Sequence, residues 1–243
     1  MLVTGAGRRL GRTIALDFAN RGWRVGIHYC DSADAAFDLV AEITRQGGQA
    51  AAFAADLARL GDLVRLVEAS AEALGPPSCL VNNAARFDFD ALGSLDGKTW
   101  QAHLDVNLRA PIFLTQAFAK TLPEGIPGNV INLIDQKVLR LDPEHFSYTI
   151  AKSALWVATR TMAQALAPEI RVNAVAPGPV LKSQGQSQAA FERECSATLL
   201  QRPVAAEDVT AAIRFLLDTK SITGQMITLD GGQHLAWKIF GNA

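Results

Sequence analysis

Tyr148 and Lys152 lie four residues apart in a segment with helical periodicity. At this spacing the two side chains share one helix face, about one turn apart. A neighbouring ammonium group favours the phenolate and lowers the tyrosine pKa from its usual value of about 10. The pair is therefore suited to proton donation near neutral pH, although the pattern alone is common on surface helices.

A glycine-rich turn, Thr4 to Gly11 (T-G-A-G-R-R-L-G), separates an apolar run from the first helical segment. Its glycines permit a tight turn and close backbone approach to a pyrophosphate, whose charge the helix N-terminus also favours. Arg8 and Arg9 place positive charge at that N-terminus, against the helix dipole, so we expect an anion there. It could be a pyrophosphate, a 2′-phosphate or an acidic edge of the substrate.

The end of the second apolar run bears on the choice between NAD and NADP. NAD sites generally place an acidic residue there, which accepts hydrogen bonds from the ribose 2′-hydroxyl. Here the run ends in His28 and Tyr29, and Ser32 follows. We expect His28, Ser32 and Arg8 to hold a 2′-phosphate, which favours NADPH over NADH. Asp31 is discordant, because its carboxylate would repel that phosphate if it faced inward.

The elements that position these residues alternate between short β-rich runs and longer helical segments, as in parallel sheets with crossover helices. The predicted strands are Met1–Thr4, Trp23–Tyr29, Gln49–Ala54, Cys79–Val81, Asn129–Ile134, Arg171–Ala174 and Gln225–Leu229. The predicted helices lie near Leu10–Arg21, Ala33–Gln46, Leu60–Leu74, Gly97–Leu122 (with a break near Asn107), Phe146–Ala167 and Ala206–Leu217. The sequence predicts one α/β domain over residues 1–243: a Rossmann-type, doubly wound parallel sheet of about seven strands, with helices on both faces.

Composition excludes several other classes of protein. The 243 residues include 23 basic and 24 acidic side chains and are 49% apolar, so the chain has ample core and no basic excess for nucleic acid. No apolar run approaches the roughly 18 residues of a membrane span. The three cysteines form no C-x-x-C pair, so neither disulfides nor a metal site is indicated. We expect a water-soluble, cytoplasmic protein without nucleic-acid or membrane partners.

Further motifs join the turn and the Tyr148/Lys152 pair in a fixed order: Asp56-Leu57, Asn82-Asn83-Ala84-Ala85, Asn107 and Pro177-Gly178. Together they resemble the short-chain dehydrogenase/reductase family over essentially the whole chain. The resemblance implies a nicotinamide cofactor, Tyr148 as proton donor and Lys152 as the residue that holds the ribose and tunes Tyr148. It implies that Asn107 supports a water that links Lys152 to solvent. The cofactor-binding residues it implies, with those reasoned above, are Gly5, Arg8, Arg9, Leu10, His28, Tyr29, Ser32, Asp56, Leu57, Asn83, Ala84, Ala85, Tyr148, Lys152, Pro177 and Gly178.

Asp135 departs from this pattern. It lies thirteen residues before Tyr148, where the family usually has a serine that holds a substrate carbonyl. An ionised aspartate would repel a developing oxyanion, so ordinary ketone reduction is disfavoured. An aspartate suits a substrate with N–H donors, or a ring nitrogen that must be protonated.

Asp135, Arg9, the His-Tyr-x-x-Ser segment and Phe87 together resemble the pteridine reductase branch, which includes dihydromonapterin and dihydrofolate reductases of this fold. That resemblance implies that Phe87 stacks on a pterin and that Arg9 contacts both phosphate and pterin; Phe87 could equally be a core or lid aromatic. Ala85 departs from the branch, where serine is frequent.

We therefore expect an NADPH-dependent reductase of a pterin-like C=N bond, with Arg9, Phe87, Asp135 and Tyr148 at the substrate. The alternatives are a general carbonyl reductase with a protonated Asp135, and a dinucleotide sensor without turnover. The resemblance also implies that the protein forms a homo-oligomer, namely a tetramer, and that Val180–Leu200 contains a substrate loop.

Overall fold

The computed structural model describes residues 1–183 and 185–237. Within these residues, seven parallel strands form one sheet in the order β3-β2-β1-β4-β5-β6-β7. The strands are β1 (Leu2–Val3), β2 (Arg24–Tyr29), β3 (Gln49–Ala54), β4 (Cys79–Asn82), β5 (Gly128–Leu133), β6 (Ile170–Pro177) and β7 (Met226–Leu229). The Rossmann-type, doubly wound sheet predicted from the sequence is confirmed.

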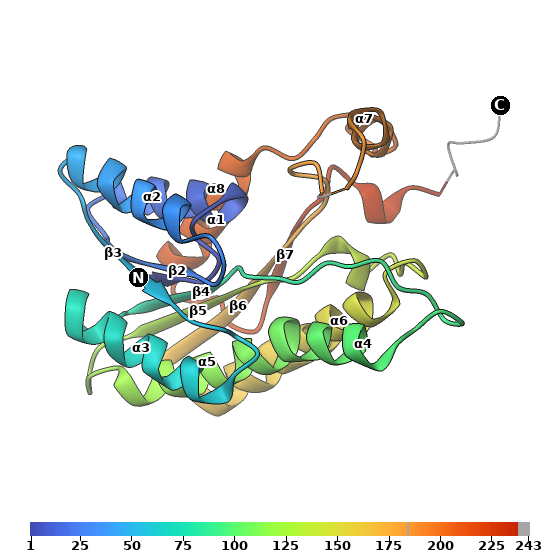
Figure 1. Cartoon of the computed structure of the whole chain (residues 1–243). Helices are drawn as coiled ribbons and strands as arrows, with labels where there is room; N and C mark the ends of the chain where they lie inside the picture. The colour runs from blue at the N-terminus through green and yellow to red at the C-terminus, as the bar shows by residue number, and fades with distance from the viewer. Residues whose placement is uncertain (184, 238–243) are drawn as a thin grey trace.

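The helices cover both faces of the sheet (Figure 1). One face carries α1 (Arg9–Ala19), α2 (Ala33–Arg45) and α8 (Ala206–Asp218), and the other carries α3 (Leu60–Leu74), α4 (Gly97–Leu104), α5 (Ala110–Thr121) and α6 (Phe146–Leu166). Helix α7 (Gln188–Ser196) lies beyond the end of β6, and short turns η2 (Gln136–Val138) and η3 (Gln233–Leu235) follow β5 and β7. None of the helices in the described part is long and apolar enough to cross a membrane.

Apolar residues of the strands fill two core layers, one on each face of the sheet. Val25, Ile27 and Val81 pack towards the layer that includes α1 and α2, whereas Leu80 and Val130 pack towards α3 and α5. This explains why the central strands appear as nearly continuous apolar runs in the sequence, as expected for a parallel sheet buried on both faces.

The break predicted near Asn107 is a π-helical turn, η1 (Asp105–Arg109), between α4 and α5. Single π-turns inside longer helices frequently accompany functional sites. Here the turn places Asn107 fully buried beneath the segment that follows β4.

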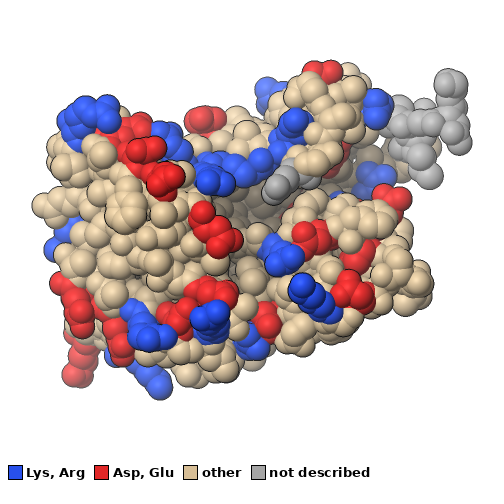
Figure 2. All heavy atoms as spheres, in the orientation of Figure 1, with Lys and Arg blue, Asp and Glu red and all other residues tan. Residues whose placement is uncertain are grey.

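The carboxyl ends of the strands meet at one edge of the sheet. The strand order reverses between β1 and β4, since β1 leads to β2 on one side and β4 leads to β5 on the other. Ligands of open α/β sheets bind in the crevice at this reversal. In Figure 2 the middle of the molecule is hollowed between the two layers, and basic and acidic side chains flank the hollow.

Candidate active site

The turn between β1 and α1 is a backbone cradle that excludes side chains. Gly5 has a φ of +62°, and a Cβ on Gly11 would lie 2.4 Å from the Gly5 carbonyl oxygen and 2.6 Å from Asn83 Nδ2. Larger residues at Gly11 would therefore displace the turn. A close-packed backbone at a helix N-terminus is the kind of turn that binds a dinucleotide pyrophosphate.

Thr4 ties this turn to the segment after β4. Its hydroxyl oxygen accepts hydrogen bonds from the backbone N–H groups of Asn83 (2.9 Å) and Ala84 (3.0 Å). The Asn83 amide donates in return to the Thr4 carbonyl at 2.8 Å. Asn83 and Ala84 thus lie beside the glycine turn, where the family resemblance expects them, although Thr4 itself was not among the predicted site residues.

His28 corrects one prediction. Its Nδ1 accepts a hydrogen bond from the Gly5 backbone at 3.0 Å, and its Nε2 lies 3.1 Å from the Ala55 carbonyl oxygen, to which it donates. Burial lowers the His28 pKa, so the ring is neutral at physiological pH. Because both ring nitrogens already form hydrogen bonds, His28 holds the glycine turn in place and has no N–H left to donate to a 2′-phosphate.

Three other residues predicted to bind the cofactor lie at or beside the glycine turn: Arg8, Arg9 and Ser32. Arg8 is exposed at the start of α1, and a Cβ on Gly7 would lie 3.1 Å from Ser32 Oγ, so Ser32 borders the same backbone. Arg9 adopts a left-handed φ of 55°, and its Nη2 donates to the Leu181 carbonyl at 3.1 Å. Arg9 therefore links the phosphate turn to the predicted substrate loop, of which residue 184 lies outside the described residues.

The other predicted cofactor residues differ in how exposed and how tightly packed they are. The Asp56 carboxylate is partly exposed and accepts from the Ala58 backbone at 2.9 Å. The Leu57 side chain is buried in the core. At the end of β6, a Cβ on Gly178 would lie 2.8 Å from Asp230 Cα, so Pro177-Gly178 packs tightly on the tail after β7. The remaining predicted positions, Leu10, Tyr29 and Ala85, range from partly buried to exposed.

The candidate reaction centre joins the end of β5 to the first turn of α6. The Tyr148 hydroxyl donates to Asp135 Oδ2 at 2.9 Å, and Asp135 Oδ1 accepts from the Lys137 backbone at 2.8 Å. Lys152 is buried, its Nζ donates to the Leu133 carbonyl at 2.7 Å, and this nitrogen lies 5.8 Å from the centre of the Tyr148 ring. The structure thus brings together the three residues that the sequence assigned to proton transfer.

The electrostatics differ from the sequence prediction. Burial, followed by the charge of Asp135 and its hydrogen bond, raises the pKa of Tyr148 well above 10, whereas Lys152 alone was expected to lower it. Burial also raises the Asp135 pKa and lowers the Lys152 pKa to about 8. Burial thus favours the neutral forms of Tyr148, Asp135 and Lys152, and the Tyr148 hydroxyl proton points at the Asp135 carboxylate.

Asn107 and Phe87 define the wall beside this centre. The Asn107 amide pairs with both the backbone N–H and the carbonyl of Arg86, each at 2.8 Å, and so fixes the segment that carries Phe87. The Phe87 ring packs edge-on to Tyr148 with 4.7 Å between centroids and stacks on His145 at 4.2 Å. It is 39% exposed, which leaves part of the ring available beside the Tyr148 side chain.

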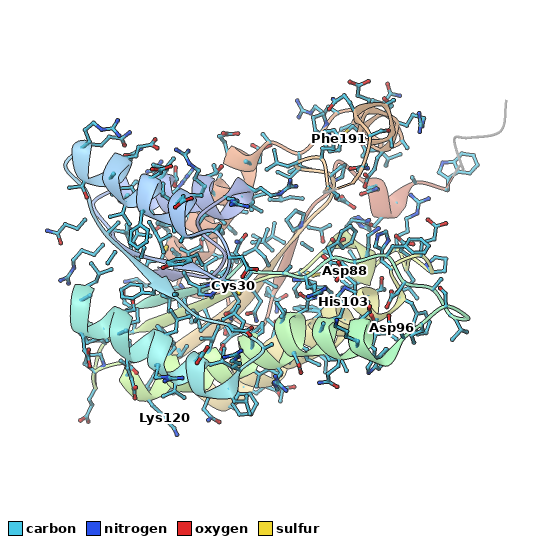
Figure 3. The ribbon with its side chains drawn as sticks, viewed as in Figure 1. Cys30, Asp88, Asp96, His103, Lys120 and Phe191 are labelled. Atoms are coloured by element: carbon cyan, nitrogen blue, oxygen red, sulfur yellow. The ribbon has the colours of Figure 1, made fainter. Side chains whose placement is uncertain are left out.

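Several polar residues near the site lacked any motif in the sequence. Lys137 and His145 both pair with the Asp142 carboxylate, and His103 contacts Asp88 and Ser147. Figure 3 shows His103 and Asp88 next to each other between α4 and the segment after β4. No cluster of metal-binding side chains occurs among residues 1–183 and 185–237.

Several known proteins are similar to this chain. The family model described as "Enoyl-(Acyl carrier protein) reductase" matches residues 5–234. A short-chain type dehydrogenase/reductase of Picea abies is 31% identical, with 96% of this chain and 91% of the relative covered. A 3-oxoacyl-[acyl-carrier-protein] reductase of Synechocystis is 33% identical, with 95% of each chain covered.

Among solved structures, the FolM alternative dihydrofolate reductase 1 of Brucella canis, complexed with NADP, superimposes with a TM-score of 0.95. It is 47% identical, and the match covers 100% of this chain and 96% of that one. The corresponding Brucella suis protein, also with NADP, has a TM-score of 0.91 and the same identity, with 97% and 95% covered.

The fold and these similarities define a dinucleotide-dependent oxidoreductase. The chain belongs to the short-chain dehydrogenase/reductase family.

Proposed function

We propose that this protein is an NADPH-dependent reductase of a pterin-like heterocycle, and that it reduces a C=N bond. The observation that carries the proposal is the hydrogen bond between the Tyr148 hydroxyl and Asp135. This arrangement presents a carboxyl group and a phenol together, which suits protonation of a ring nitrogen. The similarity to the two FolM dihydrofolate reductases supports the same substrate class.

The glycine turn, Arg8 and Ser32 are the residues that would hold the cofactor phosphates. When bound, NADPH supplies the hydride. Two similar structures contain NADP, which supports a choice of NADPH over NADH. Because His28 is committed to Gly5 and Ala55, Arg8 and Ser32 would have to carry the recognition of the 2′-phosphate.

The residues of the site would divide the reaction between them. Phe87 and Arg9 would orient the heterocycle, since one is a partly exposed ring beside Tyr148 and the other joins the glycine turn to Leu181. Tyr148 would donate its hydroxyl proton to the substrate nitrogen. Asp135, whose pKa burial raises, would then take up a proton from solvent and pass it to the tyrosine oxygen as the replacement.

Lys152 would stabilise the charge that remains after the proton leaves Tyr148. Its ammonium lies in the same buried site and is held by the Leu133 carbonyl. Asn107 would support a water between Lys152 and solvent, as the family resemblance suggests, and its side chain also fixes the position of Arg86.

A second candidate is the reduction of ketones. The relatives include 3-oxoacyl-[acyl-carrier-protein] reductases, and the raised Asp135 pKa favours a protonated carboxyl that could donate to a carbonyl oxygen. The two candidates differ in whether Asp135 meets a basic nitrogen or a developing oxyanion.

Steady-state oxidation of NADPH should be measured with dihydrobiopterin, dihydromonapterin, dihydrofolate and a series of simple ketones. We expect turnover with at least one pterin, and its loss in Tyr148→Phe. Reduction of ketones without any pterin would reject the proposed substrate class. Cofactor binding without turnover of any substrate would indicate a dinucleotide sensor instead.

A further inference from the structure

A buried chain of polar side chains connects α4, the Phe87 segment and α6. Asp90, His103 and Ser147 are 3%, 0% and 0% exposed. None belongs to the motifs that identify the cofactor site. Three polar residues placed together without access to water need mutual hydrogen bonds, because each unpaired group would carry a desolvation cost.

The direction of the hydrogen bonds follows from the groups present. The Asp88 backbone N–H can only donate, so His103 Nε2 accepts it, at 3.0 Å. The remaining nitrogen of the neutral ring, Nδ1, therefore carries the proton and donates to Ser147 Oγ at 2.5 Å. The Ser147 hydroxyl donates in turn to Asp90 Oδ2. His103 and Ser147 thus each accept one hydrogen bond and donate another, and the Asp90 carboxylate accepts the last one.

Asp90 also caps the N-terminus of α6. The residue before the helix, His145, makes no capping hydrogen bond with its side chain. Instead the Asp90 carboxylate accepts from the Ser147 backbone N–H at 3.1 and 3.3 Å, and the Asp90 carbonyl accepts from the Phe146 N–H at 3.0 Å. A carboxylate at this position satisfies free donors of the first turn and complements the helix dipole.

The residue after Ser147 is Tyr148, and Phe87 lies three residues before Asp90. The same network therefore fixes both side chains that border the reaction centre. The His103 ring itself lies edge-on to the Tyr148 ring, with 6.1 Å between centroids.

We infer that His103, Ser147 and Asp90 are positioning residues that hold Tyr148 against Asp135 and align it with Phe87. They act through the first turn of α6 and do not themselves touch the reacting atoms. The inference rests on the proposed role of Tyr148 as the proton donor.

The first test compares Ser147→Ala with Ser70→Ala. Ser70 is a serine of α3 that is 1% exposed, so the control removes an equally buried hydroxyl away from the site. Because small displacements of reacting groups strongly reduce rates, we expect kcat to fall about ten- to a hundredfold in Ser147→Ala. The NADPH Kd should change much less than kcat, because the glycine turn, which would hold the phosphates, is not part of the network. Ser70→Ala should keep the kcat of the unmodified protein.

Variants of His103 separate positioning from simple packing. His103→Asn keeps an N–H donor near the position of Nδ1, whereas His103→Leu removes it. We expect His103→Asn to retain more kcat than His103→Leu. The double variant with Ser147→Ala should lose little more than the worse single variant, because both changes break the same chain.

A spectroscopic measurement keeps the inference testable whatever the substrate proves to be. The chain has two tyrosines, so ¹³Cζ-labelled tyrosine gives one resonance for Tyr148 and one for Tyr29. Ser147→Ala and His103→Leu should shift the Tyr148 resonance and leave that of Tyr29 in place, and Ser70→Ala should shift neither. An unchanged Tyr148 resonance, or an equal kcat for Ser147→Ala and Ser70→Ala, would overturn the inference. Failure to reduce any pterin, with the Tyr148 resonance shifted, would reject only the proposed substrate.

Discussion

Replacement of Asp135 by asparagine tests the Tyr148–Asp135 pair most specifically. The side chain keeps its shape, and its oxygen can still accept from the Lys137 backbone, as Asp135 Oδ1 does at 2.8 Å. The amide nitrogen then faces the Tyr148 hydroxyl in place of Oδ2. Asparagine can neither take up nor release a proton at this position, so the pair is reduced to a single acid, Tyr148.

The size of the effect follows from the bond that is lost. A hydrogen bond to a charged group contributes about 1.5–3 kcal/mol, which corresponds to a loss of about ten- to 150-fold in kcat/KM if it acts in the transition state. Removal of the carboxylate also removes two of the causes that raise the Tyr148 pKa, its charge and its hydrogen bond. The Tyr148 pKa should therefore fall in the variant, and the phenol should ionise at lower pH.

Two measurements check this prediction: kcat/KM with the best pterin substrate, and the pH titration of the Tyr148 ¹³Cζ resonance. Asp17→Asn is the matched control, because Asp17 is also a partly buried, hydrogen-bonded carboxylate, which lies in α1 and pairs with Arg21 and Arg214. We expect the control to keep kcat/KM within about twofold, because the partners of Asp17, Arg21 and Arg214, are not residues of the candidate site. Full pterin activity in Asp135→Asn would refute the proposed role of the carboxylate.

Further predictions concern the neighbouring groups. The Lys152 pKa is lowered to about 8, so its ammonium is lost as the pH rises through that value. The kcat/KM of the unmodified protein should therefore decline above about pH 8. A decline only near the ordinary lysine pKa would contradict this prediction. Phe87→Ala should raise KM for the pterin by about three- to tenfold, since aromatic stacking contributes about 0.5–1.5 kcal/mol. The control Phe89→Ala, which removes a ring that is 66% exposed, should leave KM unchanged. Equal KM values for the two variants would contradict a role of Phe87 in stacking. Arg8→Ala should weaken NADPH binding by about tenfold or more and leave NADH binding nearly unchanged, as measured by titration calorimetry, because only NADPH carries the 2′-phosphate; equal losses for both cofactors would place Arg8 at the pyrophosphate instead.

The sequence predicted the scaffold well because its signals are local. Apolar runs, helical periods and glycine punctuation each report on neighbouring residues, and the predicted strands agree with the sheet to within a few residues. Even the break near Asn107 was predicted, although the π-helical form of the turn has no distinct composition. The family motifs likewise located Tyr148, Lys152 and Asp135 at one edge.

The sequence could not assign hydrogen-bond partners that depend on how strands and loops meet. His28 looked like a phosphate ligand because it ends a strand, but the parallel register of Ile27 with Val3 sets it beside Gly5. Similarly, the Tyr148 pKa was judged from Lys152 four residues away. The stronger influences, burial and Asp135, arise only when the end of β5 packs on the start of α6.

Transfer of deuterium from (4-²H)NADPH tests the central claim most directly. After turnover with a dihydropterin, the label should appear on the carbon of the reduced C=N bond, as read by mass spectrometry and NMR, and Tyr148→Phe should abolish its appearance. A dihydropterin recovered without label, while a ketone acquires it on the carbinol carbon, would contradict the account.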